Sequence, residues 1–136
     1  MGLLGLLTRR RQSHTAEWRS VTVVAATGRD GLSSEDAFAL RDIIAARAPL
    51  YHQFLNPGSF IVCFSSDDHG TQAANQLASE MNAFSQRAKL GAFGVGLEVG
   101  YCLASADAEG HFTSQPVGET ISRAMHSAIA RAANAL

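Results

Sequence analysis

The pattern of large apolar and small residues is clearest in residues 93–103, FGVGLEVGYCL. Large apolar side chains occupy every odd position, and the even positions carry mostly small residues, Gly94, Gly96, Gly100 and Cys102. Glu98 is the one charged residue of this run. Because successive side chains of a strand point to opposite faces of a sheet, the alternation predicts a half-buried strand. We expect its odd face to enter a core, and its nearly bare even face to admit a backbone, a helix or a flat ligand.

Three shorter apolar runs predict the other strands. Residues 21–26 (VTVVAA) and 60–64 (FIVCF) are rich in β-branched or aromatic residues and are typical of buried strands. Residues 50–55 form a weaker run, and the Asn-Pro-Gly sequence at 56–58 is typical of a tight turn. The runs on either side of this turn are therefore predicted to form a hairpin.

Apolar residues spaced three or four apart predict three helices. The first follows a serine pair at 33–34, which can cap it, and ends before Pro49. The second follows an aspartate pair at 67–68 and is closed by Gly91. Pro116 suits the first turn of the third helix. Helical and strand patterns therefore alternate along the chain.

This order predicts an α+β fold, a ferredoxin-like β-α-β-β-α-β sandwich. We expect helices on one face of an antiparallel sheet in which the first and third strands are central. A turn at 107–110, a short strand at 111–113 and a C-terminal helix should follow the sandwich. Cys63 and Cys102 then lie on strands that are not neighbours, so we expect buried, reduced thiols and no disulfide.

The first residues differ from the rest of the chain. We treat residues 1–17 as a Leu/Arg-rich segment and residues 18–136 as a single α+β domain. The leucine run is much shorter than the roughly 20 residues that span a bilayer, and its arginines follow the leucines, unlike those of a secretory signal. We expect a frayed or partner-docking helix. The alternative is weak peripheral contact of residues 1–12 with an anionic membrane surface.

Composition excludes some functions. The net charge of −1 over 136 residues lacks the basic footprint of a nucleic-acid binder. No nucleophile elbow or dinucleotide fingerprint is present, so we predict no catalytic residue, resident metal or cofactor. Taken with the reduced thiols, these features favour a cytoplasmic protein.

Two sets of acidic residues call for an interpretation. Asp107, Glu109 and His111 alternate in sequence and have the ligand types of a metal site, but a solvated turn is the simpler interpretation. Glu98 is either an outward, solvated residue or a polar group in a groove whose floor is the glycine face.

Four segments resemble the palm-like core of nucleotidyl cyclases, the class III adenylate/guanylate cyclases and the related GGDEF diguanylate cyclases. They are VTVVAATGRDG, NPGSFIVCF, GVGLEVGYCLA and PVGETISRAMHSA, which together cover the chain from about Val21 onward. The resemblance implies a nucleotide substrate and a domain that acts in pairs. It also implies two carboxylates at adjacent strand ends, which hold two divalent metals.

The chain departs from the cyclase pattern at the positions that carry the chemistry. The matching positions for the two carboxylates are Thr27 and Ser59, whose neutral hydroxyls cannot hold Mg²⁺ against water without help. Asp30 lies three residues downstream of Thr27 and is the one displaced candidate. The Asn and Arg of the cyclase helix match Ser122 and His126. This chain therefore resembles a cyclase that is degenerate at the metal-binding positions.

We therefore predict a catalytically degenerate domain that acts in regulation, ligand binding or self-association, and we lean against an enzyme. A small-molecule or nucleotide ligand would contact Thr27, Asp30, Ser59 and Glu98, and a homodimer would form through the glycine face of residues 94–100. Two alternatives stay open. One is an active nucleotide-processing enzyme or nucleotide sensor with a displaced metal site. The other is an unrelated ferredoxin-like oligomerisation module.

Overall fold

A computed structural model of the chain describes residues 15–134. Its elements are β1(Glu17–Gly28), α2(Ser34–Ala45), β2(Tyr51–Asn56), β3(Ser59–Phe64), α3(Asp68–Arg87), β4(Phe93–Ala104) and α4(Glu119–Asn134). This order confirms the predicted α+β sandwich with a C-terminal helix. Most of the segment predicted at residues 1–17 lies outside the described residues.

The four strands form one antiparallel sheet in the order β2-β3-β1-β4. β1 and β3 are central, as predicted. β1 pairs with β4 along its whole length, and Thr27 near its carboxyl end lies opposite Ser59 of β3. Cys63 and Cys102 are buried free thiols on the two strands that flank β1, so the prediction of no disulfide is confirmed.

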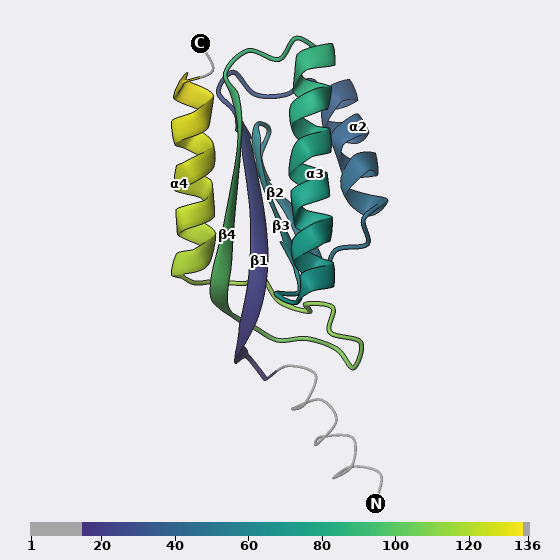
Figure 1. Cartoon of the computed structure of the whole chain (residues 1–136), viewed down its shortest axis with the longest axis vertical. Coiled ribbons are helices and arrows are strands. Elements are labelled where there is room, and N and C mark those ends of the chain that lie inside the picture. The colour runs from purple at the N-terminus through teal and green to yellow at the C-terminus, as the bar shows by residue number, and fades with distance from the viewer. Residues whose placement is uncertain (1–14, 135–136) are drawn as a thin grey trace, which may run out of the picture.

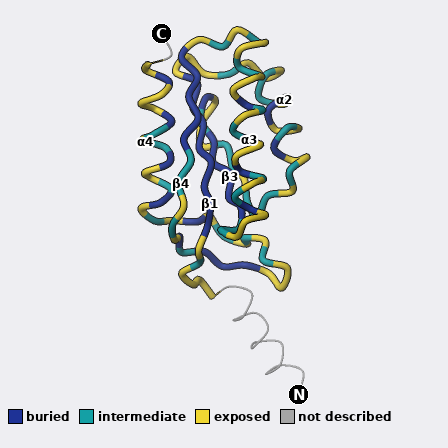
Figure 2. The backbone as a smooth tube through the Cα atoms, in the orientation of Figure 1, coloured by how far each residue is buried: buried dark blue, intermediate teal, exposed yellow. Residues whose placement is uncertain are grey.

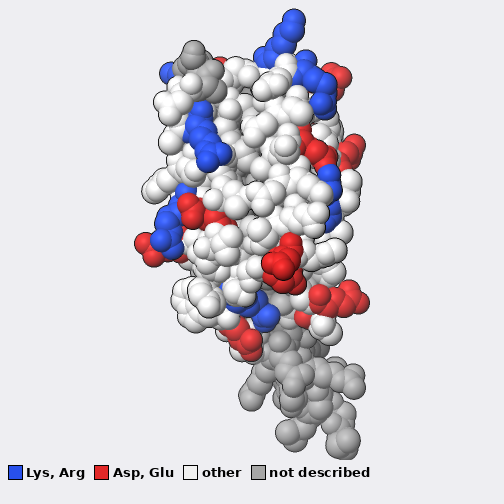
Figure 3. Space-filling model, viewed as in Figure 1, with Lys and Arg blue, Asp and Glu red and all other residues white. Residues whose placement is uncertain are grey.

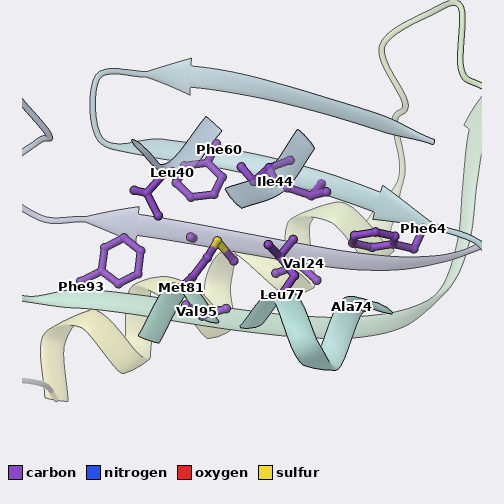
Figure 4. Packing of buried hydrophobic residues seen from close by; sticks show 12 residues of the cluster. Val24, Leu40, Ile44, Phe60, Phe64, Ala74, Leu77, Met81, Phe93 and Val95 are labelled. Atoms are coloured by element: carbon purple, nitrogen blue, oxygen red, sulfur yellow. The ribbon is translucent and has the colours of Figure 1, made fainter. Parts of the chain in front are cut away.

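α2 and α3 cover one face of the sheet (Figure 1). Their apolar stripes meet the even-numbered side chains of β1, and Figure 4 shows this core around Val24, with Leu40, Ile44, Leu77 and Met81 from the two helices. All five side chains are completely buried. In Figure 2 the helices alternate between dark blue and yellow, since each presents one side to the sheet and the other to solvent.

Both of these helices start at the caps that the sequence predicts. The Ser33 hydroxyl accepts a hydrogen bond from the backbone N–H of Asp36, and the Asp67 carboxylate accepts one from the backbone N–H of Gly70. That bond, with a second from the Ser65 hydroxyl, lowers the pKa of Asp67 below its ordinary value. The aspartate pair at 67–68 is therefore explained by capping.

α4 covers the opposite face of the sheet, which corrects the prediction that all helices share one face (Figure 1). Its buried residues recur every four positions, and two of them, Ala124 and Ala128, pack with Val21, Val23 and Ala25 of β1. β1 is therefore buried from both sides along residues 21–26, which accounts for the nearly continuous apolar run there.

The glycines of β4 make room for α4. A β-carbon at Gly94 or Gly96 would collide with the α4 backbone, at Ala128 and Ala124 respectively. A β-carbon at Gly100 would collide with the Thr120 hydroxyl, which donates a hydrogen bond of 2.8 Å to the carbonyl of Tyr101. The glycine face is therefore filled by the chain's own helix. This corrects the prediction of a homodimer built on that face.

The odd face of β4 is buried at its start only. Phe93 and Val95 join the core beneath α3, but Val99 is 54% exposed and Tyr101 is 64% exposed. The expected core burial of the whole odd face is therefore wrong for the second half of the strand. α3, which covers this face, lies over β1 and the start of β4 and leaves the second half of the odd face of β4 exposed to solvent.

A long loop leads from β4 to α4. The predicted turn is present, with a hydrogen bond of 3.1 Å from the Gly110 N–H to the Asp107 carbonyl. The short strand expected at 111–113 is present as one bridge pair, Phe112 with Ala106. In residues 15–134 no helix has the length and apolar character that crossing a membrane requires.

Candidate functional site

The two positions that correspond to cyclase metal ligands meet across the central strands. Thr27 of β1 and Ser59 of β3 are register partners, and their hydroxyl oxygens are 2.8 Å apart in a direct hydrogen bond. Thr27 is only 9% exposed, and Ser59 is half-buried. One hydroxyl donates and the other accepts, and the pair presents no negative charge to a cation.

The backbone around this pair is tightly closed. The Gly28 N–H donates to the Gly58 carbonyl at 2.7 Å, and the Leu32 N–H donates to the Pro57 carbonyl at 2.9 Å. Gly58 has no room for a β-carbon, which would lie 2.6 Å from the Gly28 carbonyl oxygen. The loop after β1 and the β2–β3 turn are thus fastened together by main-chain contacts.

Asp30, the displaced ligand candidate, does not join the hydroxyl pair. It is exposed, and its carboxylate lies beside Gly91, where an added β-carbon would be 4.0 Å from Oδ2. Gly91 precedes β4, whereas Ser59 begins β3, and these two strands flank β1 on opposite sides. The structure therefore brings Thr27 and Ser59 together and places Asp30 on the β4 side of β1.

A small pocket lies beside Thr27. It has a volume of about 260 Å³ and is lined by the end of β1 and the last turns of α4, at Thr27, Arg29, Ile129, Ala132 and Ala133. Among the described residues of this lining, Arg29 alone has an ionisable side chain. Sequence reasoning missed Arg29 and the α4 residues, because their proximity depends on where α4 ends on the sheet.

The remaining candidate residues lie apart from this pocket. Glu98 is half-buried on the α4 side of β4, opposite Val23, and forms no ion pair with another described residue. Ser122 and His126 are exposed on α4. Gly94, Gly96 and Gly100 serve helix packing, as described above. The four predicted ligand contacts therefore do not form one site.

The cysteines offer no reactive group. Burial raises the pKa of Cys63, and the neighbouring Cys102 thiol raises it further. Burial also raises the pKa of Cys102, although Arg19 opposes this shift. Both thiols are therefore held in the protonated form, which is a poor nucleophile and a poor metal ligand.

The acidic turn after β4 brings three ligand-type side chains together. Oxygen or nitrogen atoms of Asp107, Glu109 and His111 all lie within 4.8 Å of one another, and all three residues are exposed. His111 Nδ1 is 3.9 Å from Asp107 Oδ2 and 3.6 Å from Glu109 Oε2. The other oxygen of Asp107 accepts the backbone N–H groups of Glu109 and His111. This arrangement is that of a turn closed by its own aspartate.

Comparison with known proteins places the fold. No family model and no curated protein matches the chain. The adenylyl cyclase CyaB from P. aeruginosa superposes with a TM-score of 0.59 at 12% identity, over 85% of this chain and 74% of that chain. The catalytic core of a rhodopsin-guanylyl cyclase with converted specificity gives a TM-score of 0.59 at 18% identity, over 82% and 72% of the two chains.

A third similar structure is the non-canonical dimeric guanylyl cyclase domain of the RhoGC fusion protein from the aquatic fungus Blastocladiella emersonii. It matches with a TM-score of 0.52 at 18% identity, over 83% of this chain and 75% of that chain. The chain thus has the fold of a class III cyclase domain. The resemblance inferred from the four sequence segments is confirmed at the level of the fold.

Proposed function

We propose that this chain is a catalytically degenerate cyclase-like domain that acts as a homodimeric regulatory module. The observation that carries the first half is the hydrogen bond between Thr27 and Ser59. In the cyclase pattern these positions hold two divalent metals through carboxylates, and here two neutral hydroxyls share one hydrogen bond. Without the metals, the triphosphate has no counter-charge and the attacking hydroxyl has no activator.

Turnover and metal binding test this proposal together. We expect no cyclic nucleotide product from ATP or GTP with Mg²⁺ or Mn²⁺. We also expect no Mn²⁺ binding near Thr27 by calorimetry. The double variant Thr27→Asp/Ser59→Asp places two carboxylates where the hydroxyls touch, and it should gain Mn²⁺ binding and a melting temperature that rises with Mn²⁺. Cyclic product from the natural chain that is lost in Asp30→Ala would instead show an enzyme with a displaced metal ligand.

A nucleotide sensor is the second candidate, and the pocket beside Thr27 is the observation that favours it. The guanidinium of Arg29, which lines this pocket, suits a phosphate. Its volume of about 260 Å³ is below the range of roughly 300–1,000 Å³ that is typical of sites for whole small molecules. A thermal-shift panel of nucleotides decides between the two. A ligand at 100 times its dissociation constant stabilises by about 2.7 kcal/mol, whereas a module without a nucleotide site shows no shift.

The second half of the proposal, self-association, rests on an open apolar patch on the α3 side of the sheet. We define this patch as the four side chains Trp18, Val99, Tyr101 and Val117, which are 66%, 54%, 64% and 52% exposed. Trp18 pairs with Leu103 across the strands, and Val117 forms a bridge with Leu103 from the other side. Tyr101 and Val99 follow along β4 on the same face.

The composition of the open apolar patch suits a protein interface. Two of its four members are a tryptophan and a tyrosine, the residues that contribute most to binding energy in interfaces. In Figure 3 Lys, Arg, Asp and Glu side chains are spread over the visible face of the molecule, and other residues, drawn white, fill the areas between them. An exposed apolar patch such as this one usually marks a contact with another protein. Among soluble oligomers, the two-fold homodimer is the commonest. The RhoGC cyclase domain, a structural neighbour, is itself dimeric.

Light scattering at micromolar concentration tests the dimer. We expect dimer mass for the full chain and for a chain that begins at Glu17, because the patch lies in the described residues. Monomer mass for both would contradict self-association. A dimer lost only on truncation would place the contact in the N-terminal segment instead of on the patch.

A further inference from the structure

A groove separate from the hydroxyl pair lies between α2 and the edge strand β2. Its volume is about 400 Å³, within the range of sites for small molecules. One wall is a stripe of α2 formed by Ser34, Ala37, Phe38 and Arg41. The floor comes from β2, at His52, Gln53 and Phe54. His52 and Phe54 lie opposite Val62 and Phe60, which puts them on the α2 side of the sheet.

This stripe of α2 is not the one that builds the core. Leu40 and Ile44 face the sheet and are completely buried, whereas Phe38 is 55% exposed. A phenylalanine that the core does not use leaves apolar surface in water at the mouth of the groove. More than half of the Phe38 surface is therefore open to solvent and available to a ligand.

Two features hold the groove in shape. The guanidinium carbon of Arg41 lies 4.7 Å from the centre of the Phe38 ring, a cation–π distance that fixes the charged group over the wall. On the floor, Phe54 stacks on the buried ring of Phe60 with centroids 5.0 Å apart and 23° between the planes. Both aromatic surfaces are therefore in place before any ligand arrives, which lowers the entropic cost of binding.

The charge of the groove has one sign. Among the described residues that line it, the ionisable side chains are Arg41 and His52, and none is a carboxylate. Ser34 stands in the first turn of α2, where the helix dipole is positive. The acidic residues of α2, namely Glu35, Asp36 and Asp42, are absent from the lining.

We propose that this groove binds an amphipathic organic anion. An aromatic or short alkyl body lies between Phe38 and Phe54, and an anionic head group, a carboxylate in the simplest case, pairs with Arg41. Thr27 and Ser59 share the α4 side of the sheet, because Thr27 follows Val23 and Ala25 at odd positions of β1, whereas the groove is on the α2 side. This site is therefore additional to the proposed degenerate nucleotide site and does not depend on it.

Titration of the full chain with 2-naphthoate, followed by amide chemical shifts, tests the proposal. We expect saturable shifts confined to residues 34–41 and 52–54. 2-Naphthylmethanol has the same ring system without the charge and should bind at least about tenfold more weakly, a difference that corresponds to about 1.4 kcal/mol.

Substitutions on the exposed wall complete the experiment. Arg41→Gln should weaken 2-naphthoate binding about tenfold and leave 2-naphthylmethanol nearly unchanged, whereas Phe38→Ala should weaken both. Arg123→Gln removes another exposed arginine, from α4, and is the matched control, with no expected effect. Shifts scattered over the surface, equal affinity for the two probes, or the same loss in Arg123→Gln would overturn the proposal.

Discussion

β4 has one face of small residues and one face of large apolar residues, and the small-residue face is the better buried of the two. On the even face, Gly94 and Gly96 lie against the α4 backbone with no room for a β-carbon. On the odd face, the large side chains are buried at Val95 and then exposed at Val99 and Tyr101. Residue size therefore does not decide which face of a strand is covered.

The difference follows from the paths of the two covering helices. α4 runs along β4, and the recurrence of small residues on both elements lets the backbones approach closely. α3 lies over β1 and the start of β4, with its N-terminal end near Thr22 of β1. The glycine face is thus a packing surface within the domain, and the open apolar patch is the surface left for a partner.

The largest effect should come from adding a methyl group between β4 and α4. Gly96→Ala places a β-carbon against the backbone of Ala124 and Ala128, and we expect a loss of about 1–3 kcal/mol in the free energy of unfolding by urea. Gly91→Ala is the matched control, since its β-carbon would meet only Asp30 Oδ2 at 4.0 Å. The control should stay within about 0.5 kcal/mol of the natural chain. Equal losses in both variants would contradict close packing of α4 on the glycine face.

A charge on the open apolar patch should weaken dimerisation and leave the fold intact. Tyr101→Glu puts a carboxylate in the centre of the open apolar patch, and we expect the dimer dissociation constant to rise at least about tenfold. Ile129→Glu alters a side chain of α4 that is 50% exposed and is the matched control. Sedimentation at several concentrations measures both. An unchanged dimer in Tyr101→Glu, or equal weakening in the control, would remove the patch from the interface.

The sequence predicted much of the fold for physical reasons that are local. Period-2 and helical patterns located the elements, and the serine and aspartate caps located two helix starts. The face chosen by α4 was mispredicted, although the apolar run of residues 21–26 contained a signal: a strand without polar alternation needs cover on both sides. That signal predicts that both faces of β1 are covered, but it does not identify the helix that covers the second face.

The candidate site was less predictable. Thr27 and Ser59 were found through the resemblance, but their hydrogen bond depends on strand register, which no local pattern specifies. Arg29 joins Thr27 only because α4 ends beside both. The exposure of Val99 and Tyr101 depends on the path of α3 over the sheet, and a strand's own alternation cannot reveal that path.

The pH dependence of the free energy of unfolding should show that water does not reach the core beneath α4. Cys63 lies in the α4-side core, and its pKa is raised mainly by burial. The folded chain therefore keeps this proton at a pH where the unfolded chain loses it. The contribution of Cys63 to the free energy of unfolding is fully present below the ordinary thiol pKa of 9.0 and is lost as the pH rises above it. The free energy of unfolding of the natural chain should fall more steeply than that of Cys63→Ala, by up to about 1.4 kcal/mol per pH unit. Parallel curves for the two proteins would mean that water reaches the thiol.

The smallest effect we predict compares how the two helices are fastened to the sheet. On the α3 side, the buried Thr22 hydroxyl donates a hydrogen bond of 3.1 Å to the Ser65 carbonyl just before the helix. On the α4 side, the buried Thr120 hydroxyl donates one of 2.8 Å to the Tyr101 carbonyl. Thr22→Val and Thr120→Val remove one donor each at nearly constant volume, and each should cost about 1 kcal/mol.

The two bonds lie on opposite faces of the sheet, so their losses should add within about 0.5 kcal/mol in the double variant. Amide hydrogen exchange should also separate them. Thr22→Val should speed exchange in the first turn of α3, and Thr120→Val should speed it in the first turn of α4. Faster exchange in α3 after Thr120→Val, or strong coupling in the double variant, would show that the two faces of the sheet are not independent. The contrast between a face closed by its own helix and a face left for a partner would then no longer hold.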